Sequence, residues 1–330
     1  MMKVRMLVLL DILSELTDEE HILNSRALLQ ELSQRGYQTD RRSVYRDVEA
    51  LAEYGFDVVT TSKGFYMHSR KFTLAEVMLL ISAVQAAPFI TDIKTDALTV
   101  KLKSFLSVYH REGLRNASNI HGRKFTNEEV YRTIEMINLG IADKSKVSFV
   151  YYKRNINKND VLQRRGKRYI VSPYAMVWVR DRYYLVCNKD GKEGLAHYRL
   201  DRIRDVRNEK LPITPVDRIS EYTEPLDVND YASKHLNMFS GDIERIWLRC
   251  DMALLNELFD VFGDDIPVKN SGPDHFIARV ESAAGEGFVN WACSYGSKVE
   301  VLEPLELREV IRKRYSEGAE LYSREPSPKS

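Results

Sequence analysis

Arginine and aromatic side chains gather in one stretch past the middle of the chain, residues 172–203. Arg199 and Arg202 stand there among aromatic residues, with Asp201 between them. A guanidinium in such a setting needs a carboxylate, a phosphate or an aromatic face as its partner. Two interpretations stay open: Asp201 pairs with the arginines inside the protein, or the arginines bind an anionic ligand.

Short strands are the elements expected to carry these side chains. Residues 183–187 and 196–203 are β-branched or aromatic runs on either side of a polar, glycine-containing loop, the pattern of a hairpin. Residues 146–152 alternate as a further strand, and residues 169–179 contain Pro173, which predicts an edge strand or a bent one. Several short strands with no helical pattern between them predict a small barrel or a tightly curled sheet.

Charge is distributed unevenly along the chain. Residues 140–210 hold 18 Lys and Arg against 8 Asp and Glu, whereas residues 215–330 hold 13 against 22. The formal net charge of +1 therefore conceals a basic module beside an acidic one. This asymmetry predicts polyanion contact for the basic part. Lys158, Lys189 and Lys192 fit the ordinary pattern of solvated loop residues.

The first 70 residues predict three helices. An apolar-rich helix spans residues 4–16, and a second helix, residues 26–34, follows a cap at Asn24 or Ser25. The third helix, residues 41–54, lies between a good N-cap residue and a glycine.

The third helix has two faces. Val44, Val48 and Leu51 repeat with the spacing that packs one face inward. The arginines of its N-terminal half lie where a recognition helix enters the major groove, and arginine reads guanine or clamps phosphate. Residues 57–61 and 65–68 predict a hairpin, or wing. The predicted DNA-contacting residues are Ser25, Arg26, Arg41, Arg42, Ser43, Tyr45, Arg46 and Lys63.

Charge alone does not favour DNA binding in this segment, since residues 1–70 hold 9 basic and 11 acidic side chains. The order of three helices and a hairpin is what favours it. Asp47 is predicted to form a salt bridge or a cap and not to read bases.

Residues 71–139 predict a helical region. Thr73 and Glu76 form a capping box at the start of a helix, and Thr126 and Glu129 repeat the device. The region would space the flanking parts and could pair two chains; an ordinary helical subdomain stays an alternative. The expected helices cover residues 74–85 and 96–109, with a polar linker at 116–122.

Beyond residue 215 the order strand, helix, strand, helix, strand, helix predicts an α+β sandwich. Its acidity argues against direct DNA contact, and the polar tail from residue 323 is expected to be disordered. The expected strands are residues 243–250, 276–281 and 299–302, and the expected helices are residues 252–262, 287–295 and 304–321.

The stretch around residues 172–203 resembles a WYL domain, the Sm-like, SH3-type barrel of many bacterial transcription regulators. Tyr183, Tyr184 and Leu185 stand at the naming positions, with Tyr in place of Trp. The run from Tyr198 to Ile203 is similar to the family's arginine-rich run. Pro173 stands in a segment similar to the family's proline-containing strand.

Two further segments resemble the parts that flank WYL domains. Residues 43–47 are similar to the third helix of the winged helix that precedes them. Residues 291–296 and 303–308 are similar to the extension that follows them. The resemblance implies a winged helix-turn-helix at 1–70, a helical linker at 71–139, a WYL sensor at 140–212, an α+β extension at 213–322 and a tail at 323–330.

The resemblance also implies a basic, polar pocket that senses nucleotides or short nucleic acids. Carried over by position, its ligand-binding residues would be Ser172, Tyr174, Tyr183, Tyr184, His197, Arg199 and Arg202.

Signals for enzyme chemistry are missing. Cys187, Cys250 and Cys293 are isolated, so no zinc site is expected, and unpaired cysteines predict a reducing, cytoplasmic setting. No glycine-rich phosphate loop or catalytic serine elbow is present. The helix at residues 4–16 is too short to span a membrane. No metal, cofactor or catalytic residue is predicted.

The sequence therefore predicts a multidomain α+β, cytoplasmic transcription regulator that is not an enzyme. Its expected partners are a double-stranded DNA operator, an anionic effector (a nucleotide or a single-stranded oligonucleotide) and a second copy of the chain. Two alternatives stay open: an Sm-like nucleic-acid interaction module without an operator, and a winged-helix enzyme like the biotin repressor.

Overall fold

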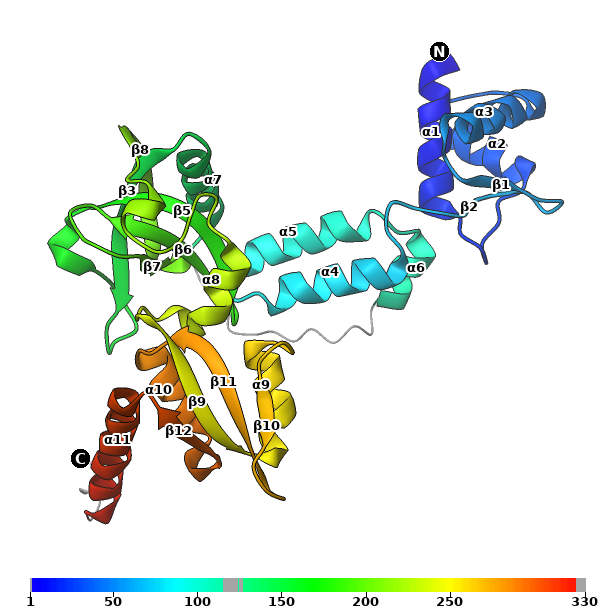
Figure 1. Cartoon of the computed structure of the whole chain (residues 1–330). Coiled ribbons are helices and arrows are strands. Elements are labelled where there is room, and N and C mark those ends of the chain that lie inside the picture. The colour runs from blue at the N-terminus through cyan, green and yellow to red at the C-terminus, as the bar shows by residue number, and fades with distance from the viewer. Residues whose placement is uncertain (1, 115–123, 125–126, 325–330) are drawn as a thin grey trace. The chain divides into compact units, whose positions relative to one another are not determined.

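The computed structural model describes residues 2–114, 124 and 127–324, and the chain divides into two compact units, residues 1–126 and 127–330 (Figure 1). The units contain helices and curled antiparallel sheets. The expected mixed α+β class is therefore confirmed. The expected linker at 116–122, the cap at Thr126 and the tail beyond residue 324 lie outside the described residues.

Three helices and a two-stranded hairpin open the first unit. Asn24 caps α2 by accepting a hydrogen bond from the Ala27 amide, and Asp40 caps α3 by accepting one from Ser43. Gly55 ends α3 in the left-handed conformation that glycine permits. The elements are α1 (Met2–Leu16), α2 (Ser25–Gln34), α3 (Arg41–Tyr54), β1 (Val58–Thr60) and β2 (Phe65–Met67).

A helical region completes this unit with α4 (Leu74–Ala86), α5 (Asp92–Lys103) and α6 (Val108–Gly113). The capping box of Thr73 and Glu76 is present. The expectation of one helix over residues 96–109 is wrong. Thr91 caps α5 by accepting a hydrogen bond from an amide, and Ser107 does the same for α6, so hydroxyl caps divide the segment in two.

A six-stranded antiparallel sheet follows α7 (Val130–Ala142) in the second unit. Its strands pair in the order β4, β3, β5, β6, β7, and β8 also pairs with β3, outside this linear order. The sheet curls around a core that includes Phe149, Leu185 and Leu200. The strands are β3 (Ser145–Arg154), β4 (Asp160–Leu162), β5 (Tyr169–Val179), β6 (Arg182–Lys189), β7 (Ala196–Arg199) and β8 (Ile203–Pro212).

Two strand expectations change in this sheet. Pro173 bends β5, because the pairing register with β6 shifts between Pro173 and Ala175, but β5 lies inside the sheet and not at its edge. The single strand expected over residues 196–203 is broken by a 3-10 turn, Leu200–Arg202, that separates β7 from β8. Arg199 therefore ends a strand, and Arg202 lies on a turn.

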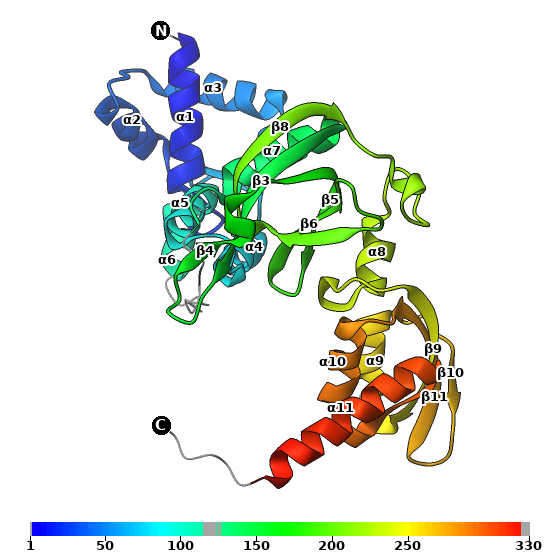
Figure 2. The ribbon, with the colours of Figure 1, turned by 90° about the vertical axis from the view of Figure 1, so that its left-hand side faces the viewer.

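The C-terminal part is a four-stranded sheet with three helices on one face (Figure 2). Its strands pair in the order β10, β11, β9, β12, and alternate residues of β9, such as Ile246 and Leu248, share a core with Phe288 and Leu307 of the helices. A connecting helix, α8 (Val228–Lys234), precedes it. The elements are β9 (Ile243–Asp251), α9 (Leu255–Phe262), β10 (Val268–Asn270), β11 (His275–Ala283), α10 (Glu286–Ser294), β12 (Val299–Glu303) and α11 (Leu305–Ser323).

Candidate functional site

Helix α3 presents two exposed arginines that have no partner among the residues that the structure describes. Val44, Val48 and Leu51 are buried in the core shared with α1 and α2, which fixes the opposite face outward. Arg42 and Arg46 are exposed, and neither has a hydrogen bond or ion pair within the described ranges. Two guanidinium groups one helical turn apart on a capped helix can bind an anion such as a nucleic-acid phosphate or a guanine edge.

Asp47 has the structural role expected of it. Its carboxylate accepts a hydrogen bond from Arg5 Nε at 2.7 Å, and a second nitrogen of Arg5 donates to the hydroxyl of Thr39 at 2.8 Å. The ion pair between Arg5 and Asp47 connects α1 to α3.

The other predicted DNA contacts surround this helix. Arg41 donates a hydrogen bond to the hydroxyl of Tyr45 at 3.3 Å. Ser43 donates to Asp40 at 2.8 Å, so its hydroxyl is engaged in the helix cap. The remaining three are Ser25 at the start of α2, Arg26 exposed beside it, and Lys63 exposed in the β1–β2 turn.

Gly64 allows the hairpin to approach the loop before α2. Its φ of +145° disfavours any side chain, and a Cβ there would lie 2.2 Å from the carbonyl oxygen of Leu23. The neighbouring Phe65 amide donates to the same oxygen at 2.8 Å. The hairpin turn is therefore fixed against the start of α2.

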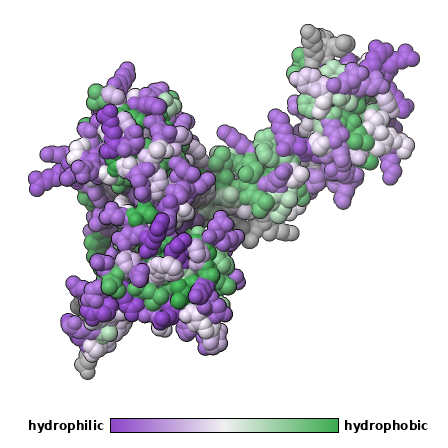
Figure 3. Space-filling view, viewed as in Figure 1, coloured by the Kyte–Doolittle hydropathy of each residue, from purple (hydrophilic) through white to green (hydrophobic). Residues whose placement is uncertain are grey.

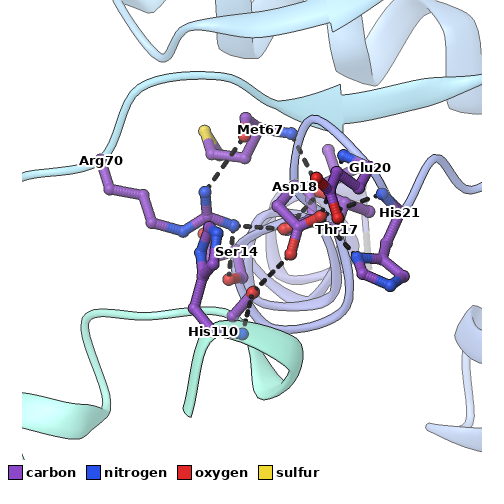
Figure 4. Close-up of polar contacts among 10 residues, drawn as sticks. Ser14, Thr17, Asp18, Glu20, His21, Met67, Arg70 and His110 are labelled. Carbon is purple, nitrogen blue, oxygen red and sulfur yellow. Dashed lines mark hydrogen bonds and ion pairs between the residues drawn. The ribbon is translucent and has the colours of Figure 1, made fainter. Parts of the chain in front are cut away.

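A buried polar network joins these helices to α6 (Figure 4). Asp18 accepts hydrogen bonds from the hydroxyl of Ser107 at 2.7 Å and from Nδ1 of His21 at 2.6 Å. Burial acts to raise the pKa of Asp18, but the hydrogen bonds outweigh it and hold the pKa below its usual value. Arg70 donates to the carbonyl oxygens of Met67, Ser14 and Thr17. These hydrogen bonds thus connect the end of α1 both to the end of the hairpin and to α6.

Ser172 and Tyr174, two of the seven predicted ligand residues, hold the chain after β8. The Ser172 hydroxyl accepts a hydrogen bond from the Thr214 amide at 3.0 Å, and the Tyr174 hydroxyl donates to the Thr214 carbonyl at 2.6 Å. Burial raises the pKa of Tyr174 to about 12. The polar atoms of both side chains are therefore engaged within the protein.

His197 is also engaged, since its Nε2 lies 2.7 Å from the hydroxyl of Tyr231 on α8. Burial, with the neighbouring His235, lowers the pKa of His197 to about 4. Tyr183 packs with the core inside the curled sheet, whereas Tyr184 packs on the opposite face with α8. The two tyrosines therefore contact different surroundings.

Arg199 and Arg202 differ in whether they have a partner within the protein. Arg199 forms a two-pronged pair with Asp201, at 3.0 and 2.8 Å, and only 9% of the Asp201 side chain is exposed. Of the two interpretations left open by the sequence, pairing with Asp201 therefore holds for Arg199. Arg202 is half-exposed and has no hydrogen bond or ion pair with any residue that the structure describes.

A basic cavity lies beside the β3–β4 hairpin, away from the seven predicted residues. It measures about 520 Å³, and Lys153, Arg154 and Arg164 supply its charge, with no carboxylate in its lining. The guanidinium of Arg164 stands 5.0 Å above the ring of Tyr169, and Lys189 approaches the same ring to 5.5 Å. Tyr169 is buried and does not line the cavity, so the cavity offers an anion its lysine and arginines but no aromatic ring.

The ring of Tyr169 belongs to a cluster with Phe149, Tyr151 and Tyr198, whose centroids lie 5.2 to 6.3 Å apart. Sequence reasoning missed this cluster, because its members come from three different strands. The one available signal was a tyrosine in each of the strand patterns. Lys189, expected to be a solvated loop residue, lies at the end of β6 over an aromatic ring.

Within the ranges that the structure describes, no group of three His, Cys, Asp or Glu side chains is placed to hold a metal ion. No helix of those ranges combines the length and apolarity that crossing a membrane requires.

Comparisons with known proteins identify two domains. The WYL domain family matches residues 132–208, and the WCX domain family matches residues 245–319. The first match starts within α7, so this helix belongs to the matched segment. A search of curated proteins found no match.

Two solved structures are similar to this chain. One is proteasome accessory factor B/C (PafBC) of Arthrobacter aurescens, with 15% identity and a TM-score of 0.29, over 94% of this chain and 47% of that one. The other is a CRISPR Cas-related protein, with 17% identity and a TM-score of 0.37, over 91% of this chain and 78% of that one. The chain spans about half the length of the first. From the family matches, the chain contains a WYL domain followed by a WCX domain.

Proposed function

We propose that this chain is a DNA-binding transcription regulator whose affinity for an operator changes when an anionic ligand occupies its WYL domain. The observation that carries the proposal is helix α3, where Arg42 and Arg46 are exposed without partners in the described ranges. The buried opposite face of α3 and the hairpin that follows it support the proposal that residues 1–70 form a winged helix-turn-helix. The presence of a WYL domain in the same chain supports this reading.

The proposed ligand is a nucleotide or a short single-stranded oligonucleotide. Phosphates pair with arginine and lysine, and bases stack on aromatic rings. The basic cavity at the β3–β4 hairpin offers Lys153, Arg154 and Arg164 for the phosphates of such a ligand. Elsewhere in the WYL domain, Arg202 is a cation without an internal partner in the described ranges. Ser172 and His197 would act on the ligand indirectly, since their polar atoms hold other parts of the protein.

The proposal includes a second copy of the chain, because helix-turn-helix readers commonly bind two half-sites as a dimer. Helices α4 and α5 leave Leu79, Ile93 and Val100 exposed by 71%, 68% and 69%. Figure 3 shows apolar surface over these helices. A ligand that binds one arrangement of the dimer more tightly shifts the population toward it and thereby changes operator affinity. Light scattering of the purified protein tests the dimer.

The proposal gives the chain a cytoplasmic setting and no catalytic role, metal or cofactor. Turnover of a nucleoside triphosphate would instead support the enzyme alternative.

Selection of genomic DNA fragments by the purified chain, at several salt concentrations and with or without an oligonucleotide pool, tests this function. Enrichment of one DNA motif, with affinity altered by the pool, is the expected result. Arg46→Ala should lose the motif, and Arg312→Ala, which removes an exposed arginine of α11, is the matched control. Capture of RNA with no DNA motif would replace the proposal with an Sm-like interaction module.

A further inference from the structure

The β3–β4 hairpin of the WYL domain extends into solvent. Residues 152–154 of β3 pair antiparallel with residues 160–162 of β4, and a short loop joins the two strands. Every residue from 153 to 162 is exposed, whereas the earlier part of β3 contributes to the core of the curled sheet. Residues 153–162 therefore form an arm of two short strands that adds no buried residue to the domain.

The arm and the turn that follows it are strongly basic. Residues 153–167 hold six Lys and Arg against a single acidic residue, Asp160. The carboxylate of Asp160 already pairs with Arg204 of β8 at 2.7 Å. Four cations of this segment have no ion-pair partner in the described part of the chain: Lys153, Lys158, Arg165 and Lys167. Their charge is therefore available to a polyanion.

The loop at the tip of the arm presents one apolar side chain among amides. Ile156 is 96% exposed, so almost its whole side chain lies in water, which is unfavourable for an aliphatic group. Asn155 fixes the loop, because its side-chain oxygen accepts from the Asn159 amide at 2.9 Å and its carbonyl accepts from the Lys158 amide at 3.0 Å. An ordered loop thus holds Ile156 outward, with Asn157 and Lys158 directly after it.

We propose that this arm enters the minor groove of duplex DNA and that Ile156 inserts between base pairs. Proteins that bind this groove contact it with Lys, Arg and Asn side chains and insert apolar side chains that kink the duplex. The arm supplies all of these groups within one hairpin. A membrane surface fits less well, because segments that bind there bury a continuous apolar face and this loop offers a single apolar side chain.

The contact goes beyond the proposed function, which places only the first 70 residues on DNA. It does not need an operator, because phosphate contacts and kinking act on a duplex of any sequence. Kinks of this kind bend DNA by about 20–90°. The hairpin also forms one wall of the basic cavity, so a single-stranded probe is needed to separate the arm from a ligand site.

Energy transfer between dyes at the two ends of a short duplex of random sequence measures the bend. Binding of the full chain should raise the transfer. Ile156→Ala should bind within about tenfold of the parent affinity but should no longer raise the transfer. The matched control is Leu211→Ala, which shortens an aliphatic side chain that is 51% exposed on β8. This control should bend the duplex like the parent.

The charge of the arm is tested on the same duplex. Lys153→Gln with Lys158→Gln should flatten the slope of log K against log salt by about 2, since each phosphate contact contributes about 0.9. The control, Lys192→Gln with Lys210→Gln, removes two exposed lysines elsewhere in the second unit and should leave the slope unchanged.

Three results would overturn the proposal. The first is a bend in Ile156→Ala equal to that of the parent, and the second is a control variant that changes the slope as much as the arm variant. The third is a loss of affinity in Ile156→Ala that is as large for the single strand, or for vesicles of anionic phospholipid, as for the duplex. Failure of the operator proposal leaves these outcomes unchanged, because none of them depends on a DNA motif.

Discussion

Helix α3 and the WYL domain use arginine in opposite ways. The segment of residues 1–70 has more acidic than basic side chains, yet Arg42 and Arg46 are exposed without partners in the described ranges. The WYL region holds a large excess of positive charge, yet many of its arginines are paired inside the domain. Those pairs are Arg199 with Asp201, Arg168 with Asp205, Arg204 with Asp160 and Arg207 with Asp205.

The difference shows that net charge is a poor guide to the charge available for a partner. A guanidinium in a bidentate pair is already satisfied, and its removal affects the stability of the fold. An unpaired guanidinium on a rigid helix costs the fold little and remains available for phosphate or base edges. The two regions should therefore respond differently to the same substitution.

Breaking the pair in the WYL domain should have the largest effect. Asp201→Ala leaves the half-buried Arg199 without its carboxylate and should lower the free energy of unfolding by about 3 kcal/mol. Tryptophan fluorescence during urea unfolding measures this, since all three tryptophans lie in the second unit. A change below about 0.5 kcal/mol, the usual size for a surface substitution, would mean that Arg199 is not engaged.

Acid should destabilise the second unit through His197. The folded pKa lies near 4 and the unfolded pKa near 6.5, so between these values the unfolded chain binds a proton that the folded chain does not. The free energy of unfolding should therefore fall as the pH drops through this window, by about 3 kcal/mol in full. Burial also lowers the pKa of His235, which acts in the same direction. In His197→Gln, the free energy of unfolding measured with urea should depend less on pH between 4 and 6.5. An unchanged pH dependence would contradict the role given to His197.

Arg46→Ala should separate binding from stability. Loss of one bidentate arginine contact reduces operator affinity by about 1–3 kcal/mol, which corresponds to roughly 5- to 150-fold. Stability should change by less than about 0.5 kcal/mol, because the side chain is exposed and unpaired in the described structure. Fluorescence anisotropy and thermal unfolding measure the two quantities. If the affinity for the operator is unaltered, α3 does not contact the DNA as proposed.

Removing a helix cap should have the smallest effect. Asn24→Ala deletes the oxygen that accepts from the Ala27 amide and should cost about 1 kcal/mol of stability. Operator affinity measured well below the unfolding temperature should stay within twofold, since the arginines of α3 are untouched. Asn24→Ser keeps a capping oxygen, so its free energy of unfolding should lie close to that of the parent protein. Thermal unfolding followed by circular dichroism measures both variants.

Local signals in the sequence predicted local structure well. The caps at Asn24, Asp40 and Thr73 lie where expected, and α3 has the predicted bounds, because these features depend on neighbouring residues. The bounds of β5 were also predicted, but its interior place in the sheet was not, since strand order depends on pairing between distant segments.

The candidate site was harder to predict for the same reason. The break at Leu200 divides what reads as one continuous strand, so Arg202 sits on a turn. Tyr174 and His197 are the expected residue types, but their partners, Thr214 and Tyr231, lie 40 and 34 residues further along the chain. Composition indicates which side chains can hold an anion; only the fold shows which are already occupied.

The salt dependence of operator binding tests the central claim most directly. Each phosphate contact contributes about 0.9 to the slope of log K against log salt. The account predicts that Arg42→Ala with Arg46→Ala flattens the slope by up to about 2, while Arg199→Ala in the more basic WYL domain leaves it unchanged. A slope that changes with Arg199→Ala but not with the α3 variant would contradict the account.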